Sequence, residues 1–318
     1  MARKRRIKKK PVIILICIII LITVISIFTI KTIKELNYRK TIEYKLLQVG
    51  YNKDEINTLK NKTNDNFMNS LLDLEYDKMY LNIINEKYYI KNNLDNYIKY
   101  YEDHIDKNST DVVALVNTGA YKEHYTDIKT SDINKNLLLI NNKYYKLPDN
   151  YEPTDLVSIK NWYSYGDNKI RKEVYDKFIE MFNSAKESNY TLIINSAYRS
   201  LKEQQEVYNQ ILSTNTQEYT DGKAARPGHS EHQTGLAIDI ITPGANGDNF
   251  DQTETFKWLE NNSYKYGFIL RYPKGKEYLT GYNYESWHFR YVGVEAATII
   301  HNEGITFDEY YAYYVENV

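Results

Sequence analysis

The sequence predicts an α+β domain that follows an apolar segment and a mainly helical region. In the second half of the chain, segments with helical spacing are mixed with short apolar segments typical of strands. Their order lacks the regular βαβ alternation of a doubly wound sheet. The chain has 318 residues, of which 42% are hydrophobic. This length suffices for one ordinary domain with additional N-terminal segments, or for two modest domains.

Charge is distributed unevenly along the chain. The net charge is −1, yet the first ten residues contain seven of the 41 basic residues, so the remainder is acidic. An acidic body excludes nucleic acid as a partner, because nucleic-acid binding requires a basic face. The 33 tyrosines indicate an AT-rich genome or, alternatively, a sugar-binding surface. The single cysteine, Cys17, lies in the apolar segment, so the fold depends on packing or on a metal and not on a disulfide.

Residues 12–30 predict a transmembrane helix. Only Thr23, Ser26 and Thr29 interrupt this apolar run of 19 residues, and such a helix is about 28 Å long, close to the thickness of the hydrocarbon core. Hydroxyl groups are tolerated there because they can donate to the helix backbone. The basic residues 1–11 predict a cytoplasmic N-terminus, with the chain from about residue 32 outside the membrane.

Three other interpretations of this segment fit the sequence less well. A cleaved signal peptide has a shorter apolar core and small residues before the cut, whereas residues 31–34 read Lys-Thr-Ile-Lys. A lipoprotein signal would use Cys17, but Ile16 precedes it where a small residue is expected. A helix buried in a protein core conflicts with the basic flank. We therefore expect a single-pass anchor that is not cleaved.

Residues 31–136 are expected to form a mainly helical spacer, or alternatively a small extracellular binding module. Apolar residues recur at helical spacing before residue 105, and no catalytic grouping is present. Two compact apolar runs, residues 112–116 and 137–140, predict strands. Residues 141–157 are rich in turn formers and predict an extended strap into the main domain, for which we expect the bounds 137–318.

The main domain alternates irregularly between helices and strands. The predicted helices are Glu173–Lys186, Lys202–Leu212 and Phe256–Tyr266, the last of them ending at Gly267. The predicted strands are Leu192–Ile194, Ala237–Ile241 and Ser286–Val292.

Asp239 is the most informative residue because it lies inside the apolar strand Ala237–Ile241. A buried carboxylate is normally paired or bound to a metal. His232, seven residues earlier, can approach Asp239 across a turn, and His288 can supply a third ligand from a separate strand. Two histidines and one carboxylate leave one zinc position open for water, as in catalytic zinc sites. The spacing alone does not decide between His229 and His232 as the first ligand.

Two further residues suit hydrolytic chemistry. Glu285 precedes His288 by three residues, and a carboxylate near an open metal position can accept a proton from water. Arg199 follows a predicted strand, and a guanidinium held there suits a developing oxyanion or a substrate carboxylate. Glu231, beside His232, is expected to be solvated.

Three segments resemble the D-alanyl-D-alanine carboxypeptidases of the VanY type, in the peptidase M15 family. They are SAYRS (196–200) with Gln204, SEHQTGLAID (230–239) and ESWHFRYVG (285–293), and the similarity covers roughly residues 137–310 in the family's order. Leu201 stands where the family more often has an aromatic residue. The resemblance implies a compact α+β fold around an antiparallel sheet and one zinc ion per chain. The residue roles it implies are zinc binding by His232, Asp239 and His288, base catalysis by Glu285, assistance at the scissile carbonyl by Arg199, and substrate contact by Ser230 and Gln204.

This resemblance implies a function outside the membrane of a bacterium. The expected reaction is removal of the terminal D-Ala from a peptidoglycan stem peptide, and the predicted external position agrees with where that substrate lies. One alternative is L,D-carboxypeptidase or endopeptidase action on the same polymer, which would use the same zinc site. A second alternative is a non-catalytic cell-wall-binding module, although such a module would have no need of Glu285.

Overall fold

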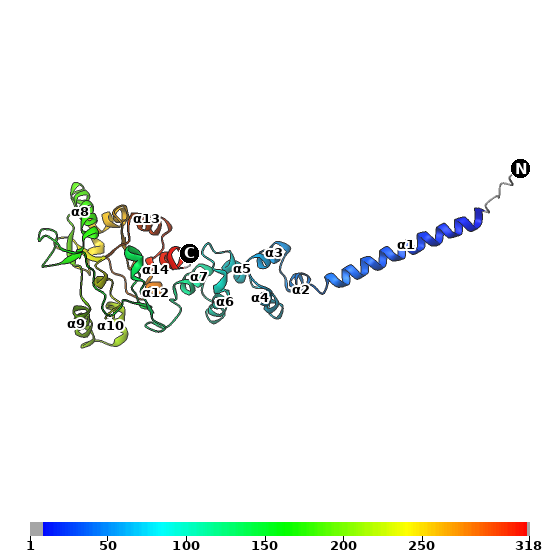
Figure 1. Cartoon of the computed structure of the whole chain (residues 1–318), viewed down its shortest axis with the longest axis horizontal. Coiled ribbons are helices and arrows are strands. Elements are labelled where there is room, and N and C mark those ends of the chain that lie inside the picture. Colours follow the sequence, from blue (N-terminus) through cyan, green and yellow to red (C-terminus); the bar gives the residue numbers. More distant parts are fainter. Residues whose placement is uncertain (1–8, 317–318) are drawn as a thin grey trace. The chain divides into compact units, whose positions relative to one another are not determined.

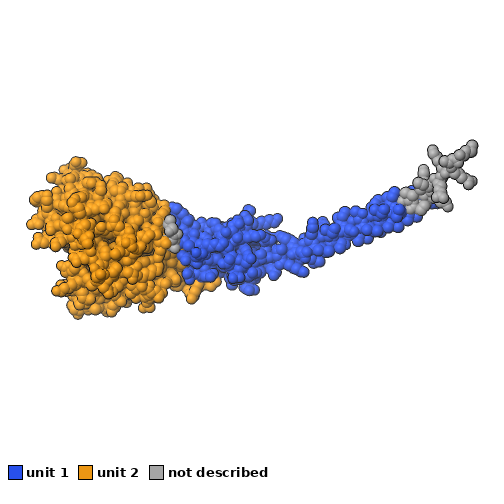
Figure 2. All heavy atoms as spheres, viewed as in Figure 1, with its two compact units in different colours: residues 1–98 blue, residues 99–318 orange. Residues whose placement is uncertain are grey.

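The structure is a computed structural model of the chain, and it describes residues 9–316. Contacts between residues divide the chain into two compact units, Met1–Ile98 and Lys99–Val318 (Figure 2). Residues 99–136 thus group with the second unit, and the functional boundary between residues 136 and 137 stays a prediction. Residues 1–8 of the predicted cytoplasmic segment lie outside the described residues.

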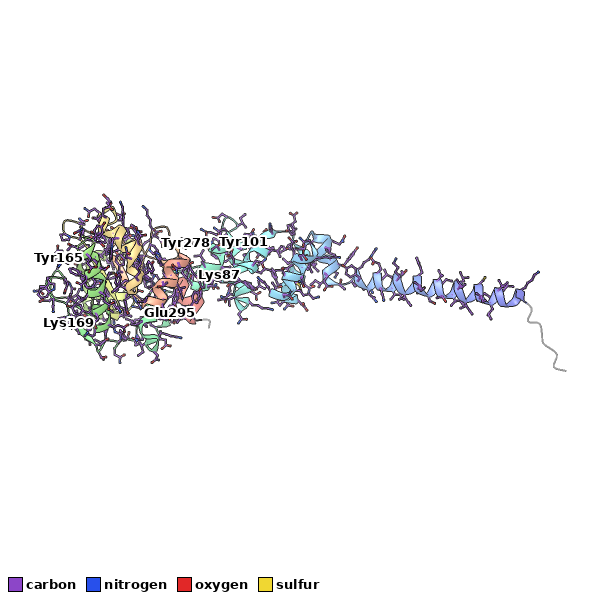
Figure 3. All side chains as sticks on the ribbon, turned by 90° about the horizontal axis from the view of Figure 1, so that it is seen from above. Lys87, Tyr101, Tyr165, Lys169, Tyr278 and Glu295 are labelled. Atoms are coloured by element: carbon purple, nitrogen blue, oxygen red, sulfur yellow. The ribbon has the colours of Figure 1, made fainter. Side chains whose placement is uncertain are left out.

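The first unit begins with α1, a single helix over Lys9–Tyr38 (Figure 1). Within the described residues, it is the one helix long and apolar enough to cross a membrane, over Ile13–Tyr38. Its described side chains stand out along its length and are exposed (Figure 3). The hydroxyls of Thr23 and Thr29 each donate to the carbonyl four residues earlier, at 2.8 Å. These two hydroxyls are therefore satisfied within the helix itself.

Short helices form the rest of the first unit, as the sequence predicts. Capping supports them: the side chain of Asn52 accepts from the backbone N–H of Glu55, and the Glu55 carboxylate accepts from that of Asn52. Leu46, Leu59 and Ile83 are fully buried between them. The helices are α2 Ile42–Val49, α3 Lys53–Lys62, α4 Asp65–Ser70, η1 Leu71–Asp73, α5 Lys78–Asn85, η2 Lys91–Asn93 and α6 Leu94–Asp103, the last of which crosses the boundary between the units.

A four-stranded antiparallel sheet lies at the centre of the second unit. Its strands are ordered β5-β6-β8-β7, with the bounds β5 Ile193–Ser196, β6 Ala237–Ile241, β8 His288–Tyr291 and β7 Phe268–Leu270. Two strand pairs lie outside it: β1 Lys129–Thr130 is parallel to β2 Tyr145–Lys146, and β3 Leu156–Ser158 is antiparallel to β4 Lys169–Arg171. The α+β class and the antiparallel sheet are confirmed.

Helices surround this sheet (Figure 1). Those with the full α-helical pattern are α7 Ser109–Thr118, α8 Lys172–Glu187, α9 Leu201–Leu212, α10 Gln217–Lys223, α11 Glu254–Asn262, α12 Glu277–Thr280, α13 Val294–Glu303 and α14 Phe307–Tyr311. Short 3₁₀ turns are η3 Ile133–Leu138, η4 Glu231–Thr234, η5 Phe250–Gln252 and η6 Ser263–Tyr266, and a π-helical turn covers Ala312–Glu316. The predicted helices near residues 173–186, 202–212 and 256–266 are confirmed within a few residues at each end.

Side chains of β6 alternate between the hydrophobic core and the face of the sheet that carries the site. Ile238 and Ile240 are fully buried in the cluster that includes Phe178 of α8 and Phe289 of β8. Because successive side chains of a strand point to opposite faces, Asp239 lies on the other face of the sheet. The core thus holds the strand in place while its one carboxylate faces away from the core.

Two predicted strands are wrong. Residues 112–116 belong to the helix α7, which Asn108 caps and Gly119 ends, and all of them are buried. Residues 137–140 pair with no strand; the carbonyls of Leu137 and Leu139 instead accept from Nη2 of Arg290, at 3.0 and 2.7 Å. In the run 112–116, where every residue is buried, there is no periodicity from which helix and strand can be told apart.

Candidate active site

Neighbouring strands bring the predicted metal ligands together. Asp239 of β6 is paired directly with His288 of β8, and His232 comes from η4, the turn that precedes β6. Oδ1 of Asp239 lies 3.2 Å from Nδ1 of His288 and 3.5 Å from Nε2 of His232. The three ligand atoms lie within 4.8 Å of one another, and all three residues are buried.

The remaining nitrogen of each imidazole also has a defined neighbour. Nδ1 of His232 lies 2.6 Å from the carbonyl oxygen of Ala197, to which it can only donate, so Nε2 keeps its lone pair. Nε2 of His288 faces Oε2 of Glu231 at 3.6 Å. Partners of this kind are characteristic of histidines that bind a metal through the opposite nitrogen.

The electrostatics favour a cation at this point. Burial by itself would raise the pKa of Asp239, but the adjacent imidazoles outweigh it and hold the pKa well below its usual range. Oδ1 of Asp239 is nevertheless a buried acceptor without a hydrogen-bond partner in the described structure. The buried, ionised oxygen of Asp239 thus lies beside two imidazole nitrogens. One carboxylate oxygen and two imidazole nitrogens are ligand atoms that Zn²⁺ prefers.

Glu285 and Arg199 flank the ligand cluster. Oε2 of Glu285 lies 3.6 Å from Nδ1 of His288, and burial raises the pKa of Glu285 to about 7. The guanidinium of Arg199 is oriented by two bonds, from Nη1 to Oε1 of Gln204 at 2.8 Å and from Nη2 to Oγ of Ser196 at 3.1 Å. A carboxylate that can exchange a proton near neutral pH therefore lies in the same site as an oriented cation.

A cavity of about 190 Å³ lies at this site. The predicted site residues that line it are Arg199, Gln204, Ser230, His232, Asp239, Glu285 and His288. The sequence missed Lys223, Tyr272 and Tyr282, which line it as well. His229 does not line it: Nδ1 of His229 lies 2.7 Å from the carbonyl oxygen of Asn142. The structure thus separates the two histidines that the spacing left equivalent.

The expectation for Glu231 is wrong. Its side chain is 1% exposed, and its Oε1 lies 2.8 Å from Nε of Arg271 and 3.0 Å from Nη1 of Arg290. Burial would raise the pKa of Glu231, but these arginines hold it below its usual range. The sequence did contain one indication of a buried carboxylate. Arg290 lies inside a predicted strand, and a buried arginine needs a carboxylate as its partner.

The sequence of this chain is similar to those of known proteins. A family model described as VanY, D-alanyl-D-alanine carboxypeptidase, matches residues 167–294, which include every predicted site residue. The putative carboxypeptidase YodJ of Bacillus subtilis (strain 168) is 41% identical over 203 residues, which cover 59% of this chain and 74% of that protein. The bifunctional D-Ala-D-Ala dipeptidase and D-Ala-D-Ala carboxypeptidase VanXYC of Enterococcus gallinarum is 34% identical over 189 residues, 58% of this chain and 97% of that protein.

A solved structure shows a similar fold. The LD-carboxypeptidase LdcB is 40% identical, and the match covers 60% of this chain and 92% of that one with a TM-score of 0.56. Both the matched family model and relatives matched over most of their length thus agree with the geometry of the site. The chain belongs to the VanY family of D-alanyl-D-alanine carboxypeptidases, in peptidase family M15.

Proposed function

We propose that this protein is a zinc-dependent carboxypeptidase that removes the terminal D-Ala from peptidoglycan stem peptides. The observation that carries the proposal is the convergence of His232, Asp239 and His288 in one buried cavity, with Glu285 beside them. Two imidazole nitrogens and one ionised carboxylate oxygen fit zinc and leave a position open. Zinc bound there would supply a Lewis acid for the scissile carbonyl and for the attacking water.

Glu285 is the base in this proposal. It accepts a proton from the attacking water and later donates it to the leaving amine of D-Ala. A base is most effective when its pKa lies near the working pH, and burial brings the pKa of Glu285 to about 7. Its position 3.6 Å from His288 keeps it beside the ligand cluster, where the proton must be taken up.

Arg199 binds the developing oxyanion or the terminal carboxylate of the peptide. Its bonds to Gln204 and Ser196 orient the guanidinium while leaving it at the cavity wall. Gln204 therefore acts partly through Arg199, and it also donates to the carbonyl of Ala225 at 2.7 Å. Ser230, whose carbonyl accepts from Asn141 at 2.8 Å, is held at the same wall and contacts the substrate.

L,D-carboxypeptidase activity is the second candidate, and one observation favours it. LdcB, an LD-carboxypeptidase, matches this chain with 40% identity. Both reactions, and endopeptidase cleavage of the same polymer, would use the same ligands and base, and only the shape of the cavity would distinguish the substrates. The non-catalytic alternative is less consistent with the chain, because Glu285 lines the cavity beside the cluster.

The protein is proposed to act outside the cell membrane of a bacterium. The apolar helix α1 supports a single-pass anchor over residues 12–30, with residues 1–11 in the cytoplasm. In this arrangement residues 31–136 are a spacer or a small extracellular module, and residues 137–318 are the peptidase domain. Peptidoglycan stem peptides would then be accessible to the cavity.

Product analysis tests this function. The full chain in detergent is incubated with one defined pentapeptide ending in D-Ala-D-Ala and one tetrapeptide ending in a single D-Ala, and the products are identified by mass spectrometry. The proposal predicts loss of one D-Ala from the pentapeptide, abolished by a chelator and restored by zinc. Loss of D-Ala from the tetrapeptide alone would support the L,D alternative. No hydrolysis of either peptide would contradict both.

A further inference from the structure

Four charged side chains form a buried ion cluster on the far side of His288 from Asp239. Glu231, Arg271, Arg290 and Asp308 are exposed by 1%, 0%, 0% and 3%. Arg271 donates from Nε to Oε1 of Glu231 at 2.8 Å and from Nη1 to Oδ2 of Asp308 at 2.6 Å. Arg290 approaches the same Oε1 of Glu231 at 3.0 Å. Two positive and two negative charges balance within this buried ion cluster.

Its place in the fold suggests a role beyond stability. Burying ions is costly, and apolar side chains can often replace a buried ion pair without loss of stability. In this cluster, however, only Oε1 of Glu231 is used by the arginines. Oε2 of Glu231 has no hydrogen-bond partner in the described structure, and neither has Nε2 of His288, which lies 3.6 Å from it. Two unpartnered buried atoms of opposite character therefore face each other.

The position of the proton on His288 depends on this pair of atoms. Nδ1 of His288 is the atom that faces Oδ1 of Asp239, at 3.2 Å. A neutral imidazole binds a metal only through the nitrogen that lacks the proton, so Nδ1 can serve as a ligand only when Nε2 carries the hydrogen. An acceptor opposite Nε2 selects this tautomer, and a donor there would select the other.

We propose that Glu231 is a positioning residue that selects the Nε2-protonated tautomer of His288 and so prepares Nδ1 to bind the metal. This inference rests on the proposed function, because it needs the metal site. Arg271 and Arg290 act one step further away. By occupying Oε1, they leave Oε2 as the oxygen that accepts from His288. Carboxylates in this position are known to orient metal-bound histidines in general.

The variant Glu231→Gln of the full chain tests this role, with Co²⁺ as a spectroscopic probe and Zn²⁺ for the measurement of affinity. The glutamine keeps the size of the side chain, and its oxygen can still accept from the arginines. Its amide nitrogen then faces Nε2 of His288 as a donor and favours the wrong tautomer. We expect the affinity for Zn²⁺ to fall by about 10–100-fold and the visible spectrum of the Co²⁺-loaded protein to change.

Asp308→Asn is the matched control. Asp308 contacts Arg271 and also accepts from Nδ2 of Asn142 at 2.7 Å, but no contact joins it to His288 in the described structure. This variant should lower the melting temperature while leaving Zn²⁺ affinity and the Co²⁺ spectrum unchanged. If Asp308→Asn weakens Zn²⁺ binding as much as Glu231→Gln does, the buried ion cluster is only structural and the inference is overturned.

A measurement on the wild type keeps the inference testable even if Glu231→Gln does not fold. The ¹⁵N chemical shifts of the imidazole of His288 in the Zn²⁺-loaded chain report which nitrogen is protonated. A proton on Nε2 and metal on Nδ1 are expected. Metal on Nε2, or wild-type affinity in Glu231→Gln, would overturn this inference alone. A wild type that binds no Zn²⁺ would overturn the proposed function with it.

Discussion

Lys143, beside the site, shows how strongly burial changes the pKa of a single side chain. Its side chain is fully buried, with Nζ 3.2 Å from the hydroxyl of Tyr125 and 3.8 Å from the ring centre of Tyr282, a residue of the cavity wall. Nζ also donates to the carbonyl of Asp221. Burial lowers the pKa of Lys143 to about 7, although nearby carboxylates oppose the shift. The charged and titratable groups around it are His124, Tyr125, Asp221, Arg226, Tyr282 and Glu285.

The stability of the protein should therefore rise with pH above neutrality. Between about pH 7 and the ordinary value of 10.5, unfolded Lys143 holds a proton that the folded side chain has lost. The unfolded state then binds more protons, so the free energy of unfolding increases with pH, by up to about 1.4 kcal/mol per unit from this group. Below pH 7 both states are protonated and the slope from Lys143 disappears.

Urea unfolding of the wild type and Lys143→Met, at several pH values in this window, measures the effect. The methionine cannot titrate, so the variant should lack this part of the slope. Equal slopes in the two proteins would show that Lys143 keeps its proton when folded.

At the residue scale, the sequence predicted those site residues whose chemistry conflicts with their surroundings. Asp239 stands alone in an apolar strand, so a partner or a metal was required. Glu231 was missed because its neighbours in sequence are polar, and only the fold brings Arg271 and Arg290 from β7's end and from β8 to meet it. Pairing over such a separation leaves no local pattern.

The turn from η6 into β7 depends on one glycine. Gly267 has φ of +87°, and a Cβ placed there would lie 2.6 Å from Cε2 of Tyr291 and 3.0 Å from the backbone of Gly293. Gly304 has a similar left-handed φ of +63° at the end of α13, but no atom lies within 4 Å of its added Cβ. A comparison of alanine substitutions at these two glycines therefore distinguishes the cost of backbone strain from the cost of steric overlap.

We predict that Gly267→Ala is markedly more destabilising than Gly304→Ala. Both variants incur the left-handed backbone penalty of about 1–2 kcal/mol, but only Gly267→Ala adds overlap with β8 and the turn after it. Chemical denaturation of both variants gives the difference. Equal losses would mean that Tyr291 moves aside freely and that β7 and β8 are less closely packed than the structure shows.

At the element scale, the sequence predicted elements that have a periodic face. Helix α8 buries Val174, Phe178 and Met181 at helical spacing, and β6 was predicted with its observed bounds. The wrong strand at residues 112–116 had no such face, because every residue of this run in α7 is buried. Residues 137–140 were misassigned because their carbonyls bond to the side chain of Arg290 and not to a strand.

The whole molecule combines an apolar helix with a peptidase unit. We predict that the full chain stays in the membrane fraction, with its C-terminal part accessible to protease from outside, because α1 contains the apolar run of residues 12–30 behind a basic flank. A chain that begins near residue 38 should be soluble and active, since no site residue precedes it. Cell fractionation and N-terminal sequencing test this. A mature protein that is released and begins after residue 30 would indicate a cleaved signal peptide instead.

At the scale of the whole chain, local sequence patterns do not reveal the boundary between the two compact units. Residues 99–136 were assigned to the predicted spacer together with the residues before them, yet they group with the second unit. Contacts such as that of the Tyr278 hydroxyl with Asp111, at 2.8 Å, join this part of the chain to residues far along the sequence. Such long-range packing is decided by the fold and not by local composition.

The most direct test of a metal-dependent peptidase with Glu285 as its base is the turnover of Glu285→Gln. The glutamine keeps the size of the side chain but cannot accept a proton from water. Zinc content and melting temperature should therefore stay as in the wild type, while kcat on a D-Ala-D-Ala-terminated stem peptide should fall by about 10²–10⁴-fold. Glu295→Gln, at an exposed glutamate of α13 labelled in Figure 3, is the control and should keep full activity. Normal turnover by zinc-loaded Glu285→Gln would contradict the account.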